Sequence, residues 1–207
     1  MTRLSLLEKL EETYPVDLLK KYTAKDYFNL PEGSPYQLIE GELIMTPSPL
    51  TEHQAILRNL GVLIANHLKK IKLGYVYYAP IDVYLDNKNA YQPDIIFISN
   101  ENKDIIKKRG IDGPPDLVIE ILSPSNEYYD IKIKKEVYEK SGVLEYIIVD
   151  PKAKSVEIFR RTGGNLKTNA ALEKWDEVLS AKLDDNGRIY IETLDLTIDL
   201  NDIFTEI

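Results

Sequence analysis

Hydrophobic residues recur along the chain with two periods, one typical of helices and one of strands. Between positions 51 and 72 they recur every three or four residues, which predicts the longest helix: Ile56, Leu57, Leu60, Leu63, Ile64 and Leu68. Thr51 begins a capping-box pattern and is therefore expected to cap this helix. Shorter helices are expected over residues 3–12 and over residues 24–30, the second capped by Thr23.

Strand patterns are more numerous than helical ones. Residues 36–40 and 42–46 alternate apolar with polar positions around Gly41, which predicts a tight hairpin. A helix is expected over residues 130–141. Further strands are expected at residues 75–79, 81–85, 94–99, 116–123, 145–149, 156–160, 189–193 and 196–200. These elements predict an α/β or α+β fold with a central mixed β-sheet flanked by helices.

Composition narrows the class of protein. A chain of 207 residues is expected to form one domain. We divide it into an N-terminal helical arm, residues 1–22, and a single domain, residues 23–207. No apolar run approaches the roughly 18 residues that span a bilayer, and no secretion signal is evident, so a cytoplasmic protein is expected. The sequence has no cysteine and only two histidines, which excludes thiolate chemistry and leaves oxygen ligands.

The net charge of −8 is unevenly distributed. Residues 176–207 hold nine acidic and two basic residues, a net of −7, which leaves −1 for the first 175 residues. The C-terminal strands are therefore acidic, and the body of the chain can still hold a local basic groove. One basic run is typical of a solvated surface and is also a candidate contact for a nucleic-acid backbone: Lys103, Lys107, Lys108 and Arg109.

Two carboxylates stand within apolar strand segments. Glu120 interrupts the apolar run 117–122, where an unpaired charge would cost several kcal/mol. Asp94 begins a second apolar strand and shares a face with Ile96, whereas Glu120 shares a face with Val118. If the two strands are neighbours with these faces aligned, both carboxylates converge on one side of the sheet.

A lysine on the following helix points toward the same region. On a helical wheel, Lys134 falls in the apolar arc with Val137 and Tyr138, while the neighbouring charged residues fall on the solvent side. Each residue has an ordinary structural explanation: Asp94 can open a strand, Glu120 can pair with a cation, and Lys134 can extend to solvent. A structural ion pair, however, needs one acid, and this sequence supplies two.

These residue types suit one chemistry. Two carboxylates present the oxygen ligands that Mg²⁺ or Mn²⁺ prefers. Such a metal acidifies water and neutralises charge on a phosphoryl oxygen, and a nearby lysine stabilises the same charge. The set predicts phosphodiester hydrolysis without a side-chain nucleophile.

The motifs around these residues resemble a known family. The run from Gly113 to Ser125, with Asp130, Lys134 and Tyr138 downstream, is similar to the Uma-two family of restriction endonucleases, within the PD-(D/E)XK nuclease superfamily. Further segments fit the same family: Tyr-Gln-Leu-Ile-Glu-Gly-Glu at 36–42, Met-Thr-Pro-Ser-Pro at 45–49, Glu-His-Gln at 52–54, Ala-Pro-Ile-Asp-Val at 79–83 and the stretch 141–151.

The resemblance implies a restriction-endonuclease-like α/β/α fold, Mg²⁺ dependence, a DNA substrate and frequent homodimers. It implies that Asp94 and Glu120 bind the metal, with the backbone carbonyl of Ile121 beside them. Lys134 would replace the lysine that the superfamily carries where this chain has Leu122. The resemblance also implies a catalytic role for Glu42. His53 and Gln54 match family positions near the cleft, with no assigned role.

Three functions remain open at this point. The first is a metal-dependent endonuclease that cuts DNA at Asp94, Glu120, Lys134 and Glu42. The second is a catalytically idle nuclease fold that serves as a binding module, its carboxylates and Lys134 forming a buried ion-pair network. The third is a hydrolase of a small phosphodiester, which the acidic charge tolerates better.

Overall fold

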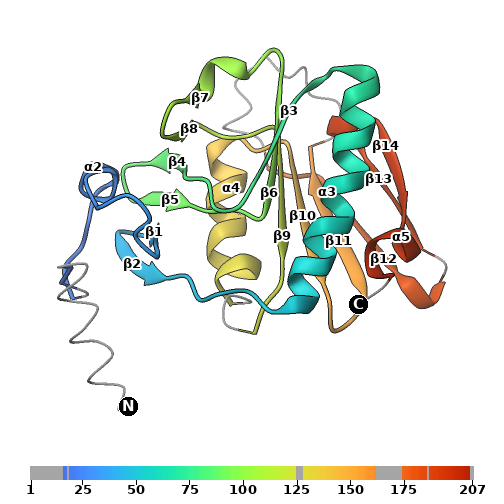
Figure 1. Ribbon diagram of the computed structural model, residues 1–207, viewed down its shortest axis with the longest axis horizontal. Helices are drawn as coiled ribbons and strands as arrows, with labels where there is room; N and C mark the ends of the chain where they lie inside the picture. Colours follow the sequence, from blue (N-terminus) through green and yellow to red (C-terminus); the bar gives the residue numbers. More distant parts are fainter. Residues whose placement is uncertain (1–15, 18, 125–127, 162–173, 186, 206–207) are drawn as a thin grey trace.

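The computed structural model describes residues 16–17, 19–124, 128–161, 174–185 and 187–205 (Figure 1). The helix expected over residues 3–12 lies outside the described residues, as does most of the expected arm. The described chain forms two six-stranded sheets and one two-stranded sheet, with helices packed against them. None of its helices is long and apolar enough to cross a membrane.

The main sheet carries the core of the protein. Its order is β12 (Glu177–Lys182), β11 (Ser155–Arg160), β10 (Glu145–Asp150), β9 (Leu117–Ile121), β6 (Ile95–Ser99) and β3 (Gly74–Tyr78). All neighbouring pairs are antiparallel except β9 and β10, which are parallel. Parallel strands require a crossover, and a π-helical segment, η2 (Tyr129–Lys134), followed by α4 (Lys135–Ser141), provides it.

The second and third sheets lie beside the main one. The second has the order β2 (Glu42–Met45), β1 (Tyr36–Ile39), β5 (Asn89–Tyr91), β4 (Val83–Asp86), β8 (Gly110–Asp112) and β7 (Ile106–Lys107). The third pairs β13 (Arg188–Ile191) with β14 (Leu196–Asp199). Within the described residues, the other helices are α2 (Ala24–Phe28), α3 (Thr51–Ile71), α5 (Leu200–Phe204) and the short 3₁₀ turns η1 (Lys103–Ile105), η4 (Leu183–Asp185) and η5 (Glu192–Leu194).

Strand alternation divides the main sheet into two buried faces. Odd-numbered residues such as Ile95 and Ile119 pack against α3, whereas even-numbered residues such as Ile96 and Val118 pack against Tyr138 of α4. Figure 1 accordingly shows α3 and α4 on opposite sides of the sheet. The expected mixed sheet flanked by helices is confirmed.

Several local predictions are confirmed and one is wrong. The hairpin of β1 and β2 forms, and Thr23 caps α2 with a complete capping box. The long helix also forms, but Thr51 is its first residue rather than its cap. The cap position is Leu50, whose side chain cannot accept a hydrogen bond, so the start of α3 is set by the preceding chain rather than by a capping box.

Candidate active site

A cavity of about 690 Å³ opens at the point where β6, β9, η2 and the start of α3 meet. Three carboxylates line it, those of Asp94, Glu120 and Asp130, together with the side chains of Lys134 and His53. The rest of its lining is neutral and includes the segments 33–35 and 46–50 as well as Gln54, Ser123 and Pro124. The cavity is therefore polar at its base and lined mainly by proline and small polar residues around its rim.

Sheet register brings the first two carboxylates together. β6 and β9 pair antiparallel with Ile95 opposite Ile119 and Ile96 opposite Val118. Continued by one residue, this register sets Asp94 opposite Glu120, and both belong to the even-numbered face. The predicted convergence of the two acids on one cavity is confirmed.

Glu120 is held by two donors in a fully buried position. Its Oε1 accepts a hydrogen bond from Lys134 Nζ at 3.0 Å and another from the Tyr138 hydroxyl at 2.9 Å. Burial raises the pKa of the Glu120 carboxyl, and the charges of Asp130 and Asp94 add to this effect, while Lys134 opposes it. The net result is a pKa of about 8. Burial thus favours the protonated form of Glu120, and a further positive charge nearby would favour the ionised form.

Lys134 lies between two acids rather than beside one. Its ammonium group is 2.8 Å from Asp130 Oδ1 and 3.0 Å from Glu120 Oε1. Burial lowers the pKa of Lys134, but the two carboxylates outweigh burial and raise it above its usual value. The Tyr146 hydroxyl donates to the Asp130 carbonyl at 2.9 Å and so ties the π-helical turn to β10. Lys134 therefore stays charged. When Glu120 and Asp130 are both ionised, these two acids outnumber the single positive charge of Lys134.

Asp94 is oriented by a separate pair of donors. Its Oδ2 accepts the backbone N–H of Ile121 at 2.8 Å and lies 3.1 Å from His53 Nε2. Because a carboxylate can only accept, the Nε2–H of His53 is the donor. Burial lowers the pKa of His53, but the hydrogen bond and charge of Asp94 outweigh burial, so that the pKa is raised. These contacts fix the direction of the Asp94 side chain.

Sequence reasoning missed one buried acid and one aromatic partner. Asp130 and Tyr138 both belong to the family motif but were assigned no role in the site, and Tyr138 was otherwise placed on the apolar face of its helix. The signal for Asp130 was its spacing of four residues from Lys134, which places the two side chains side by side on a helix. His53 and Gln54, expected near the cleft, both line the cavity.

Glu42 lies apart from this cavity. Its side chain is half exposed and forms an ion pair with Lys21 at 2.6 Å, at the start of β2. It is not among the residues that line the cavity. The structure thus brings together Asp94, Glu120 and Lys134, with Ile121 beside them, but not Glu42.

Comparison with known proteins agrees with this fold. A solved structure described as "a putative nuclease belonging to DUF820" from Anabaena variabilis ATCC 29413 aligns with a TM-score of 0.70 and 20% identity, over 88% of this chain and 97% of that chain. The fold is therefore nuclease-like. A family model, Uma2, described as "Putative restriction endonuclease", matches residues 24–185, and the chain belongs to this family. No curated protein matches the sequence.

Proposed function

We propose that this protein is a metal-dependent endonuclease that hydrolyses DNA phosphodiester bonds in the cavity of Asp94, Glu120 and Lys134. The observation that carries the proposal is the meeting of two carboxylates from paired strands with one buried lysine from the crossover helix. A structural ion pair needs Lys134 and one acid, whereas three carboxylates share the two basic side chains of this cavity, Lys134 and His53.

The electrostatics of the cavity favour a bound cation. The two basic side chains in its lining, His53 and Lys134, both contact carboxylates. When all three carboxylates are ionised, a phosphodiester that entered this cavity would meet excess negative charge. A divalent ion removes this repulsion, which supports a requirement for metal.

The donor set suits Mg²⁺ or Mn²⁺. Among the described residues, Asp94 Oδ1 and Glu120 Oε2 accept no hydrogen bond, since the contacts of these side chains go to their other oxygens. No three His, Cys, Asp or Glu side chains of the described chain form a metal-holding group. Two carboxylates, a backbone carbonyl of Ile121 and water match Mg²⁺, which takes few protein ligands. When bound, the ion acidifies water and neutralises charge on the phosphoryl group.

The chain's own residues then have separate tasks. His53 and the Ile121 N–H hold Asp94 in one orientation, and Tyr138 holds Glu120. Lys134 supplies a permanent positive charge at the base of the cavity, where low dielectric strengthens its effect on a developing phosphoryl charge. Asp130 keeps Lys134 protonated and in place.

Plasmid nicking with purified full-length protein tests this proposal. Wild-type protein is expected to cut with Mg²⁺ or Mn²⁺ and not with EDTA. Asp94→Asn and Lys134→Met are expected to lose about 100-fold or more in rate, because each removes a group that acts on the transition state. Glu42→Gln is the matched control, since Glu42 is an acid outside the cavity, and it is expected to cut like wild type.

Two results would contradict the proposal. Equal cleavage by all four proteins would mean that the activity lies elsewhere or is a contaminant. An absence of cleavage, together with a melting temperature that Mg²⁺ leaves unchanged, would favour the idle binding module, because a ligand of the folded state must raise its stability. Cleavage of a small chromogenic phosphodiester but not of DNA would favour the third function.

A further inference from the structure

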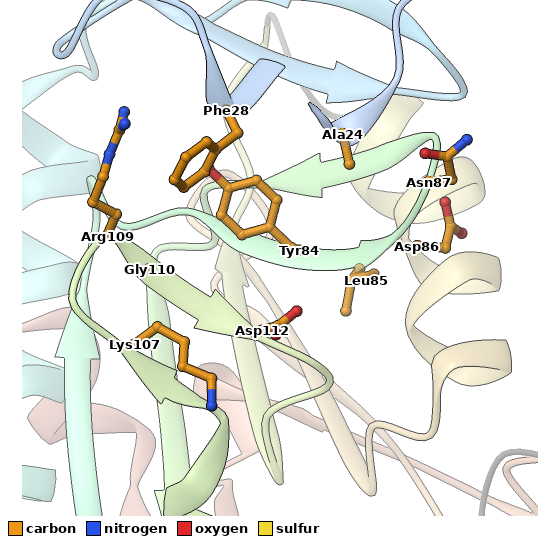
Figure 2. Close-up of a pocket in the computed structure, with 10 residues that line it drawn as sticks. All are labelled: Ala24, Phe28, Tyr84, Leu85, Asp86, Asn87, Lys107, Arg109, Gly110 and Asp112. Carbon is orange, nitrogen blue, oxygen red and sulfur yellow. The ribbon is translucent and has the colours of Figure 1, made fainter. Parts of the chain in front are cut away.

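A second cavity, of about 500 Å³, lies between α2, β4 and the hairpin of β7 and β8 (Figure 2). It shares no lining residue with the candidate active site. Phe28 of α2 and Tyr84 of β4 form its aromatic part, and Lys107 and Arg109 flank it from the hairpin. This combination of rings and cations is not used by the proposed hydrolysis.

The aromatic part is more exposed than packing requires. Phe28 is 41% exposed, and its ring centroid lies 6.1 Å from that of Tyr84 at an interplanar angle of 57°. Figure 2 shows the two rings next to each other at the cavity. Exposed aromatic faces in a concave site are suited to stacking on the flat face of a nucleobase.

The hairpin carries Lys107, Lys108 and Arg109, which belong to the basic run noted in the sequence. The guanidinium of Arg109 lies over the Phe28 ring, 4.3 Å from its centroid, so a positive charge already covers one face of this ring. Lys103, Lys107, Lys108 and Arg109 are all exposed, and within the described chain none of them forms an ion pair with a carboxylate. In a protein of charge −8, such a cluster is a local site for phosphate.

The remaining polar groups restrict how a nucleotide lies in the cavity. Burial, with the charge of Asp82, raises the pKa of Tyr84 to about 12, so its hydroxyl stays neutral. Asp86 is occupied by the Asn89 amide at 2.8 Å and by a backbone N–H of the turn. Asp112 repels a phosphate but accepts from an exocyclic amino group, which is a feature of three of the four bases.

A chain of hydrogen bonds lies between the two cavities. Gln92, which lines the candidate active site, donates to Asp82 Oδ1 at 2.9 Å. The same oxygen accepts from the hydroxyl of Tyr27 at 2.7 Å, and Tyr27 is the neighbour of Phe28 in α2. Hydrogen bonds thus link a residue that lines the candidate active site to the neighbour of a residue that lines the second cavity.

We propose that this second cavity binds an unpaired nucleotide of a single-stranded nucleic acid, with its base against Phe28 and Tyr84 and its phosphate at Arg109 and Lys107. The proposal rests on the proposed function for its ligand class, but its test does not require cleavage. Paired bases in a duplex present only their edges, so the preference is for single strands.

Fluorescence anisotropy with a labelled single-stranded oligonucleotide, in EDTA, measures this binding without cleavage. Phe28→Ala is expected to weaken binding about 10-fold, as the loss of one base-stacking contact does. Tyr75→Ala, which removes a 45% exposed aromatic from β3 outside both cavities, is the matched control. Arg109→Gln is expected to reduce the slope of log K against log salt concentration by about one. Lys70→Gln on α3 is expected to leave this slope unchanged.

The outcomes separate this proposal from the proposed function. Phe28→Leu keeps the packing of α2 and is expected to weaken binding as Phe28→Ala does, which excludes unfolding as the cause. Unchanged single-strand binding in the Phe28 and Arg109 variants would overturn the proposal, as would an equal loss for a duplex of the same sequence. Hydrolysis of bis(p-nitrophenyl) phosphate is expected to be unaffected by Phe28→Ala. If that hydrolysis is absent in wild type while the binding results hold, the proposed function fails and the nucleotide site stands.

Discussion

Replacing Glu120 by Gln is expected to stabilise the metal-free protein. Lys134 retains Asp130 as its partner at 2.8 Å, so it is not left as an unpaired buried charge. The amide oxygen of Gln still accepts from Lys134 and from the hydroxyl of Tyr138, which donate to Glu120 Oε1 in the wild type. The substitution therefore removes the cost of ionising a buried acid and keeps its hydrogen bonds.

The magnitude follows from the pKa of Glu120. Burial raises this pKa from 4.5 to about 8. An acid whose pKa is higher in the folded state costs nothing at low pH and becomes destabilising as pH rises from the unfolded value to the folded one. At about 1.4 kcal/mol per pKa unit, the cost is about 3 kcal/mol at pH 7 and about 5 kcal/mol above pH 8. Glu120→Gln should recover this amount.

Urea denaturation in EDTA at pH 4, 7 and 9 measures the effect. The unfolding free energies of wild type and Glu120→Gln are expected to coincide at pH 4 and to diverge in favour of the variant as pH rises. Glu136→Gln is the control, because Glu136 pairs with Lys140 on the exposed side of α4. It is expected to cause no measurable change at any pH.

A destabilised Glu120→Gln at pH 7 would refute this reasoning. Such a result would mean that Glu120 is ionised and is needed to neutralise Lys134, as in a purely structural ion pair. A gain in stability that does not grow with pH would also contradict it, since the effect would then come from packing and not from charge.

Three further predictions follow from particular contacts. Tyr138→Phe should destabilise the protein by about 1–2 kcal/mol in urea denaturation, because it removes a buried donor to Glu120; an unchanged stability would show that this hydrogen bond contributes nothing. Thr51→Ala should change the unfolding free energy by no more than about 0.5 kcal/mol relative to wild type, because Thr51 is not the cap of α3. A loss above about 1 kcal/mol would show that Thr51 does cap the helix. Mg²⁺ at 10 mM should raise the melting temperature of wild type but not of Asp94→Asn, and an equal rise in both would place the ion elsewhere.

The convergence of the site was predictable because local rules decide it. Strand alternation fixes the faces of Asp94 and Glu120, and helical spacing fixes the direction of Lys134. The one further assumption was that the strands of Asp94 and Glu120 are neighbours, which β6 and β9 confirm. The spacing of Asp130 from Lys134 also predicts their contact, but Asp130 interrupts no apolar strand and so does not stand out in the sequence.

Other features depend on the tertiary structure and have no local signal. β5 is a three-residue strand directly after the turn at residues 87–88, and its pairing with β1 and β4 sets its conformation. β12 is an edge strand with no apolar alternation, so its sequence does not distinguish it from a loop. The start of α3 at Thr51 likewise follows from the approach of the preceding chain.

The position of the lysine on the crossover, rather than on a strand, affects when the site can exist during synthesis. Asp130 and Lys134 are fixed by a turn whose anchor, the hydroxyl of Tyr146, lies on β10. A nascent chain that has emerged from the ribosome only as far as residue 134 holds both strand carboxylates but lacks this anchor. The proposed site therefore assembles only after β10 has joined the sheet, so it cannot form on a nascent chain that ends at residue 134.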